Sequence, residues 1–227
     1  MPDFALQWDQ AGERLYETGV DRGVLFVRES GAYAAGVAWN GLTSVEESPS
    51  GADNTDIWAD NIKYLNLVSA EDYGFTINAY TYPEEWEECD GSRAAVNGVY
   101  IGQQTRKKFA FSWRSKIGND EEGVDHGYKI HLVYMCSAAP SSRTHSTIND
   151  SPEASEMSWE VTTTAVAIRN HPELKPTAHI TIDSTKVPSE KLTNFESVLY
   201  GTAGSGNSAV ASRLPEPDEV ISMLTAP

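Results

Sequence analysis

Two consecutive stretches alternate apolar and polar side chains every second residue, which is the repeat of a β-strand. Within Lys107–Ile117 the aromatic residues share one face, and the residues of the other face are Lys108, Ala110, Ser112, Arg114 and Lys116. Gly127–Cys136 repeats the pattern after the turn-forming sequence GNDEEG. The two stretches predict a β-hairpin with an inner and an outer face.

The rest of the chain is also biased toward strands. Val, Ile and Thr are frequent, and aromatic residues make up 10% of the 227 residues. Such side chains suit the half-buried surface of a sheet. Further strand-like runs are Arg22–Val27, Tyr33–Trp39, Ile57–Val68, Gly74–Tyr82, Glu156–Ile168 and Ala178–Asp183. Ile57–Val68 contains two strand fragments around Asp60 and Asn61. We therefore expect a mainly β protein.

One segment has helical periodicity. Between Pro188 and Gly201, apolar residues recur at helical spacing, at Leu192, Phe195, Val198 and Leu199. A shorter helix is expected from Pro83 (PEEWEEC), because proline suits the first helical position and acids complement the positive end of a helix. One amphipathic helix against a β layer would make an economical core.

Three segments are too polar or irregular to belong to that core. Residues 42–56 (LTSVEESPSGADNTD) are acidic and interrupted by Pro49 and Gly51, so we expect a projecting loop. Residues 1–20 are expected to form an N-terminal arm, and residues 201–227 a flexible linker followed by a C-terminal arm whose apolar part needs a docking surface. The whole chain, 1–227, is expected to be a single domain.

The charge of the chain is large and unevenly distributed. There are 33 acidic and 17 basic residues, a net charge of −16, which disfavours tight binding of nucleic-acid phosphates. Gly91–Asn119 nevertheless contains no acid; its bases are Arg93, Arg106, Lys107, Lys108, Arg114 and Lys116. These bases either are neutralised by neighbours within the same fold or form one half of a self-complementary surface that joins copies of the chain.

The sequence offers little catalytic or metal-binding chemistry. Cys89 and Cys136 are expected to be reduced thiols. His126 and His131 are five residues apart on one strand and therefore point to opposite faces, and the other histidines lack ligand spacing, so no metal or cofactor is expected. Phosphate-binding loops, nucleophile elbows and dinucleotide fingerprints do not occur in the sequence.

Two residue sets keep other functions open. Glu84, Glu85, Glu87 and Glu88 include pairs of carboxylates such as a glycosidase uses, although an exposed helix turn explains them better. Six tryptophans could form the sugar-stacking platform of a carbohydrate-binding β-sandwich, although core or interface anchors are the more usual role. The carbohydrate-binding module is the principal alternative function.

Several phrases of the sequence are family-typical. RGVLFV, IGQQTRKKFAFSWRSKIGND, GYKIHLVY, INDSPEASEMSWEVTTT, ITIDSTKV and LPEPDEVI resemble, in this order, segments of the major tail proteins, or tail tube proteins, of long-tailed bacteriophages. The resemblance runs from about Asp21 to Leu224. The first twenty residues and the insertion GTAGSGNSAVASR lie outside it.

The resemblance implies a tail-tube-type β-sandwich with one flanking helix and extended arms. It implies homohexameric rings that stack into a tube, together with other phage tail proteins, in a virion tail assembled in the host cytoplasm. DNA would pass through the lumen without specific binding, and no catalysis or membrane is implied. The candidate interface residues are then the acids Glu46, Glu47, Asp53 and Asp56 and the bases Arg106, Lys107, Lys108, Arg114 and Lys116.

Overall fold

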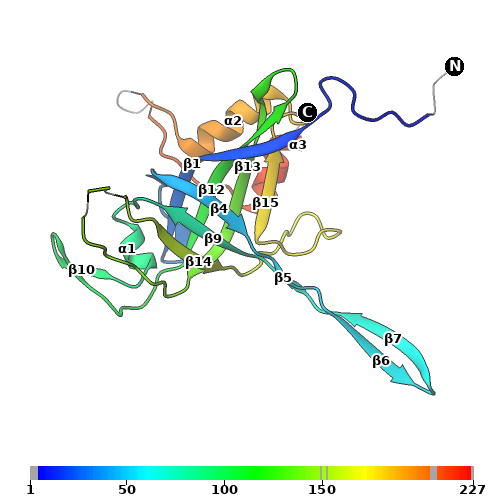
Figure 1. Ribbon diagram of the computed structural model, residues 1–227, viewed down its shortest axis with the longest axis horizontal. Helices are drawn as coiled ribbons and strands as arrows, with labels where there is room; N and C mark the ends of the chain where they lie inside the picture. The colour runs from blue at the N-terminus through cyan, green and yellow to red at the C-terminus, as the bar shows by residue number, and fades with distance from the viewer. Residues whose placement is uncertain (1–4, 149, 152, 205–208, 226–227) are drawn as a thin grey trace.

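The body of the protein is an antiparallel sheet that doubles over into two layers (Figure 1). The computed structural model describes residues 5–148, 150–151, 153–204 and 209–225. The strands of the first layer are β1 (Tyr16–Glu29), β3 (Val37–Trp39), β12 (Phe109–Asn119), β13 (Gly123–Ala138) and β15 (His179–Asp183). The strands of the second layer are β4 (Leu42–Glu47), β9 (Gly74–Ala79) and β14 (Met157–Thr162).

Smaller elements decorate this body. β2 (Ala32–Tyr33) pairs with the end of β1. The paired short strands are β5 (Ser50–Gly51) with β8 (Glu71–Asp72), β6 (Asn54–Ala59) with β7 (Ile62–Val68), and β10 (Arg93–Val96) with β11 (Val99–Ile101). The helices are α1 (Trp86–Cys89), α2 (Ser189–Tyr200) and α3 (Pro217–Thr225). The predicted mainly β architecture is confirmed.

Strand β13 belongs to both layers. Its first half pairs with β12 and β15, and its last residues pair with β14. Between the pairs Phe111↔Val133 and Phe109↔Cys136, β13 contains one residue more than β12, which defines a β-bulge. Met135 takes a positive φ of 50° there, and its N–H donates to the Tyr33 hydroxyl at 3.0 Å. The bulge lets one strand turn from the first layer into the second.

Aromatic side chains fill the space between the two layers. Trp39 packs against Trp86 at a ring-centroid distance of 4.7 Å and against Trp159 at 5.6 Å. Phe75 from the second layer stacks on Trp113 from the first at 5.6 Å. All five side chains are buried. Offset and edge-to-face contacts of this kind stabilise a core beyond the area that they bury.

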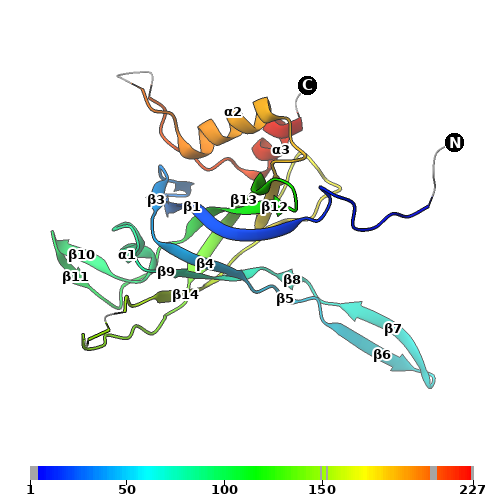
Figure 2. The ribbon, with the colours of Figure 1, turned by 45° about the horizontal axis from the view of Figure 1, so that its top comes forward.

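A second core lies on the other side of the first layer, under α2 and α3 (Figure 2). Helix residues Phe195 and Leu199 are fully buried against sheet residues that include Phe26 and Leu132. The prediction that Ala110 lies on an outer, polar face of the Lys107–Ile117 strand is therefore wrong, because Ala110 is fully buried in this core. The alternation of side chains does not predict this burial, because alanine is small and occurs on both buried and exposed faces.

Several predicted elements are confirmed. The β12–β13 hairpin turns at the expected place, with Asn119 paired to Gly123. Helix α2 follows Pro188 and ends before Gly201, whose φ is +76°. A side chain at Gly201 would place its Cβ 2.6 Å from the Val210 carbonyl oxygen, so only glycine fits there. The expected turn at Asp60 and Asn61 is also present, with φ values of 51° and 63°.

Three predicted projecting segments are wrong in their boundaries. Residues 16–20 of the predicted N-terminal arm belong to β1, which pairs with β12 from Tyr16 onward. Residues 42–47 are not a loop but strand β4, which pairs with β9, and the projecting part starts after Ser48. The polar character of residues 42–47 reflects the position of β4 at the edge of the sheet and not the absence of regular structure. The C-terminal residues 217–225 form α3, which buries Pro217 and Val220 against the body. Residues 1–4, 205–208 and 226–227 of the predicted arms lie outside the described residues.

The outer core predicts a specific cost for truncation in α2. Phe195→Ala should lower the free energy of unfolding by about 3–5 kcal/mol, because it leaves a cavity between α2 and the sheet. Asn194→Ala, at the exposed neighbouring position of the same helix, is the matched control and should change it by less than about 0.5 kcal/mol. Urea denaturation followed by tryptophan fluorescence measures both. A loss below about 1 kcal/mol for Phe195→Ala would show that the helix layer does not contribute as described.

Candidate assembly surfaces

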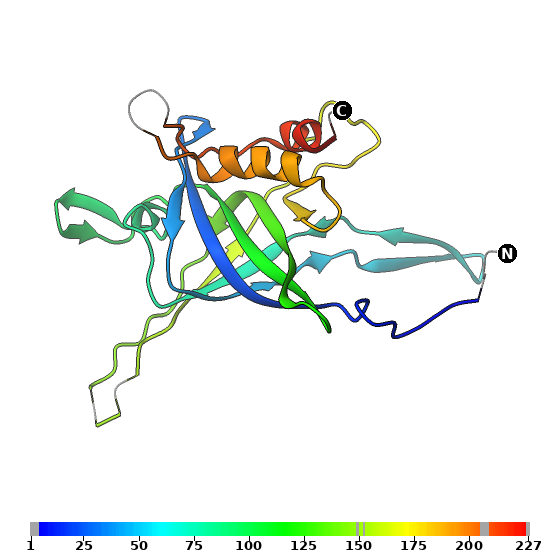
Figure 3. The same ribbon diagram turned by 90° about the horizontal axis from the view of Figure 1, so that it is seen from above.

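The most prominent surface feature is a two-stranded ribbon, residues 49–72, that projects far from the body (Figure 3). β5 and β8 form its base, and β6 and β7 form its outer part. At the junction of these two parts, Ser69 N–H donates to the Asp53 carbonyl at 3.0 Å, and Asp53 N–H donates to Ser69 Oγ at 2.9 Å. The ribbon is therefore closed by its own backbone pairing and not by contact with the core.

The outer part of the ribbon exposes large apolar side chains. Trp58 is 67% exposed and Tyr64 is 64% exposed. The other exposed apolar side chains of β6 and β7 are Ile57, Ile62, Leu65, Leu67 and Val68. A hairpin without a third strand or a covering helix is only marginally stable in water, and clustered apolar exposure marks an interaction surface. The ribbon is thus the principal candidate interface of the described chain.

Two further projections expose apolar residues. The β10–β11 hairpin presents Val96, Val99 and Ile101, each at least 48% exposed. It extends from the side of the body opposite to the ribbon in all three ribbon views (Figures 1–3). Leu6 and Trp8, in the extended segment before β1, are 76% and 72% exposed. The body thus carries apolar projections that point in opposite directions.

The four candidate acids do not form one surface. Asp53 and Asp56 lie on the ribbon, where Asp56 pairs with Lys63 across the hairpin at 2.6 Å. Glu46 points outward from β4 and accepts a hydrogen bond from Asn78 at 3.4 Å. Glu47, the next residue, points inward toward two histidines. Their role in assembly stays a prediction.

Three of the five candidate bases have acidic partners in their own chain. Arg106 pairs with Asp90 at 3.1 Å. Lys107 bridges Glu29 and Glu88. These ion pairs agree with the first interpretation of Gly91–Asn119, in which its bases are neutralised by acids of the same fold. Within the described residues, no acid lies within ion-pair distance of Lys108 or Lys116, and Lys108 is exposed.

Arg114 makes the most specific of these ion pairs. Its Nε and Nη2 donate to the two carboxylate oxygens of Asp21, both at 2.7 Å, and its guanidinium lies 4.8 Å from the ring centre of Tyr128. The bidentate geometry joins β12 to β1 beside helix α2. The hydrogen bond from Arg114 holds the pKa of Asp21 below its usual value of 3.8.

The glutamates that suggested a glycosidase and the tryptophans that suggested a sugar-binding platform mostly make structural contacts within the fold. Tyr100 and Tyr82 donate hydrogen bonds to Glu84 and Glu87, both at 2.8 Å. Four tryptophans are buried, and the exposed Trp8 and Trp58 lie on separate projections. A continuous sugar-stacking platform of six tryptophans is therefore not present.

Cys89 and Cys136 are buried free thiols, as expected, and burial raises the pKa of Cys89 to about 12.

Comparisons with known proteins give only distant similarities. No family model and no curated protein matches the chain. Among solved structures, a chain of the extended PVC sheath-tube complex of an extracellular contractile injection system covers 71% of this chain and 88% of its own, at 13% identity and a TM-score of 0.30. A chain of the sheath/tube terminator of that system in the extended state covers 78% and 99%, at 10% identity and a TM-score of 0.32. Similarity at this level assigns neither family nor function.

The described part of the chain contains no helix that is long and apolar enough to cross a membrane.

The Asp21–Arg114 pair predicts a pH-dependent stability. Asp21→Asn should lower the free energy of unfolding by about 1–2 kcal/mol at pH 7, because it removes a charge-assisted pair that is partly exposed. The folded pKa of Asp21 lies below the unfolded value, so its contribution is present above about pH 4 and is lost as the pH falls through the folded pKa. The difference between wild type and variant should therefore shrink below about pH 4. Urea denaturation between pH 7 and pH 3 measures it, with the exposed Asp125→Asn as control.

Proposed function

We propose that this chain is a structural subunit that assembles into a tail tube, in which rings stack and the ribbon of one subunit packs on a neighbouring subunit. The observation that carries the proposal is the ribbon itself, which exposes seven large apolar side chains on a hairpin that has no core of its own. A neighbouring copy can bury these side chains. In this proposal the protein acts without catalysis.

The sequence resemblance supports the same function. Its quoted phrases fall on body elements, including β1, β12, β13, β14 and β15, and the last phrase includes the start of α3. The ribbon carries none of the quoted phrases, whereas the longest phrase begins at Ile101 of the β10–β11 hairpin.

The arrangement of the projections supports stacking. Because the ribbon and the β10–β11 hairpin point in opposite directions, contacts between copies can be head to tail, and a head-to-tail contact either closes a ring or continues as a filament. The edge strands β4 and β15 each pair on one side only. Pairing these edges between subunits would close six copies into a ring and remove the exposed edges.

The charge suits a passive conduit. Each chain carries a net charge of −16, so a hexameric ring would carry six times that charge before counterions bind. An acidic lumen repels DNA phosphates, so that DNA would slide without specific binding. We propose that the tube belongs to a virion tail, assembles in the host cytoplasm and contacts other tail proteins at its ends.

Removing the outer ribbon tests the proposal. Residues 54–68 can be replaced by Asn-Gly, because Asp53 and Ser69 are already paired and a two-residue turn closes such a ladder. The shortened protein should remain a folded monomer, with a melting temperature within about 3 °C of wild type, and should form no tubes. Electron microscopy, light scattering and thermal unfolding measure these outcomes.

Point variants provide the matched comparison. Trp58→Ser with Tyr64→Ser should abolish tubes, whereas Val124→Ser with Leu174→Ser, which removes exposed apolar side chains outside the ribbon, should leave them intact. Long tubes from the shortened protein would contradict the proposed role of the ribbon. A wild-type protein that stays monomeric at all concentrations but binds a glycan array would favour the carbohydrate-binding alternative.

The basic strand gives a separate prediction for assembly. No acid of the described chain lies within ion-pair distance of Lys108 or Lys116, although Lys116 attracts Asp21 at longer range. Reversing both to Glu therefore tests an interface while the hydrogen bonds between Asp21 and Arg114 remain available. The double variant should form at most one tenth as many tubes as wild type, because like charges would then meet at the interface, while its melting temperature should fall by only a few degrees. Lys175→Glu with Lys191→Glu is the control for net charge. Normal tube yield from Lys108→Glu with Lys116→Glu would refute a role for these two bases in assembly.

A further inference from the structure

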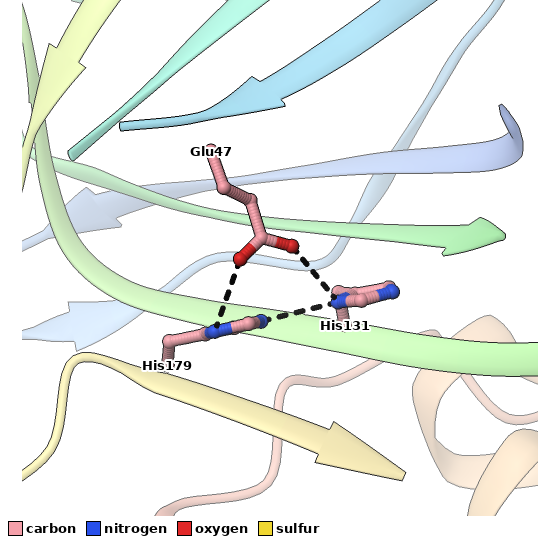
Figure 4. A group of neighbouring side chains, drawn as sticks. All are labelled: Glu47, His131 and His179. Atoms are coloured by element: carbon pink, nitrogen blue, oxygen red, sulfur yellow. Dashed lines mark hydrogen bonds and ion pairs between the residues drawn. The ribbon is translucent and has the colours of Figure 1, made fainter. Parts of the chain in front are cut away.

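Three side chains from the two layers of the body lie close together (Figure 4). Glu47 is the last residue of β4, His131 lies in the middle of β13, and His179 begins β15. His131 Nδ1 lies 3.2 Å from His179 Nε2 and 3.7 Å from Glu47 Oε1. The other carboxylate oxygen, Oε2, lies 4.0 Å from His179 Nδ1. A carboxylate from one layer thus faces two imidazoles from the other.

These distances fit a metal centre. Zn²⁺ with nitrogen and oxygen ligands at about 2.0–2.2 Å in tetrahedral geometry places its ligand atoms about 3.3 Å apart. His131 Nδ1 and His179 Nε2 already have about this separation. Glu47 Oε1 lies 3.7 Å from His131 Nδ1, and one ligand atom from each of the three residues lies within 4.8 Å of the others, so the Glu47 side chain must move closer to complete the site. Glu47 has the freedom to do so, because its side chain is 41% exposed at the end of an edge strand. Two histidines and one carboxylate are a ligand set that divalent transition metals favour.

The two imidazole rings are held in place by their surroundings. Trp113 stacks on His131 at 4.8 Å with an interplanar angle of 1°, and Tyr73 stacks on His179 at 4.4 Å. Ser115 Oγ lies 3.0 Å from His131 Nε2, the nitrogen that points away from the cluster. A metal-binding histidine usually has such a partner on its second nitrogen, which fixes the ring and its tautomer.

Two clefts reach the cluster from the surface. One, of about 290 Å³, is lined by Glu47, Ser115 and His131. The other, of about 740 Å³, is lined by Tyr73 and His179. A hydrated ion can therefore enter, and water can occupy a coordination position that the protein leaves open.

We propose that Glu47, His131 and His179 bind one divalent metal ion of the zinc class, with an open position for water. The ion would join β4 to β13 and β15, and so connect the strand from which the ribbon emerges to the opposite layer. This inference goes beyond the proposed function and does not depend on tube formation. A hydrogen bond between the two imidazoles, with no ion, is the competing explanation of the cluster.

Metal titration of the isolated full chain tests the proposal. Protein without a polyhistidine tag, dialysed against a chelator, is titrated with ZnCl₂ by calorimetry, and its thermal unfolding is followed with and without Zn²⁺. Wild type should bind one ion per chain, and saturating Zn²⁺ should raise the melting temperature because it binds only the folded state. Added chelator should reverse the increase. Co²⁺ in place of Zn²⁺ should give the strong visible absorption of a four-coordinate site.

Variants assign the ligands. Glu47→Gln and His179→Gln should each weaken Zn²⁺ binding at least tenfold and abolish the increase in melting temperature. Glu47 is the more informative position, because it is half-exposed and its amide variant should fold normally. The controls are Glu46→Gln, the adjacent acid on the outer face, and His171→Gln, a histidine outside the cluster. Both should bind Zn²⁺ like wild type.

Three results would overturn the proposal. The first is a wild-type protein that shows neither heat of binding nor a shift in melting temperature with excess Zn²⁺. The second is unchanged affinity in both Glu47→Gln and His179→Gln. The third is loss of binding in His171→Gln with binding retained in Glu47→Gln, which would place the ion elsewhere.

Discussion

The bend of β13 at Met135 is the constraint on which the rest of the structure depends. Since this strand serves both layers, its bulge sets how the aromatic core closes, and its first half carries the outer core under α2. The extra residue leaves a backbone N–H outside the regular ladder, and the Tyr33 hydroxyl satisfies it. A buried N–H without such a partner would cost free energy comparable to a lost hydrogen bond, so Tyr33 is as much a part of the bend as Met135.

Electrostatics in this chain operates at two scales. Locally, the basic stretch is tied into the fold, because Arg106, Lys107 and Arg114 each contact a carboxylate of their own chain. Globally, an excess of acids remains, and the chain keeps a net charge of −16. Local pairing fixes how strands and helices meet, while the remaining negative charge acts on anything large and anionic that approaches, and the two effects involve largely different residues.

The sequence predicts those elements that depend on contacts between residues close together along the chain. The β12–β13 hairpin and helix α2 follow from periodicity and from flanking turn residues, so helix α2 is predicted nearly to the residue and β12 to within two residues, whereas β13 begins four residues before the predicted Gly127. Long-range pairing is not encoded in that way. Nothing in residues 42–47 reveals that β9 will pair with them. His131 and His179 are 48 residues apart, and only the pairing of β13 with β15 brings them together. The inward position of Glu47 depends on the same kind of contact.

The separate closure of the ribbon has a consequence for how such a protein can diversify. Its outer strands hydrogen-bond to each other and meet the body only through the short β5–β8 base, so substitutions there leave both cores intact. Selection can therefore alter which neighbour the ribbon recognises without a compensating change in the sandwich. In the body the opposite holds, since each aromatic residue touches several others and a change at one requires repacking of the rest. The chain thus combines a conservative scaffold with an appendage free to drift.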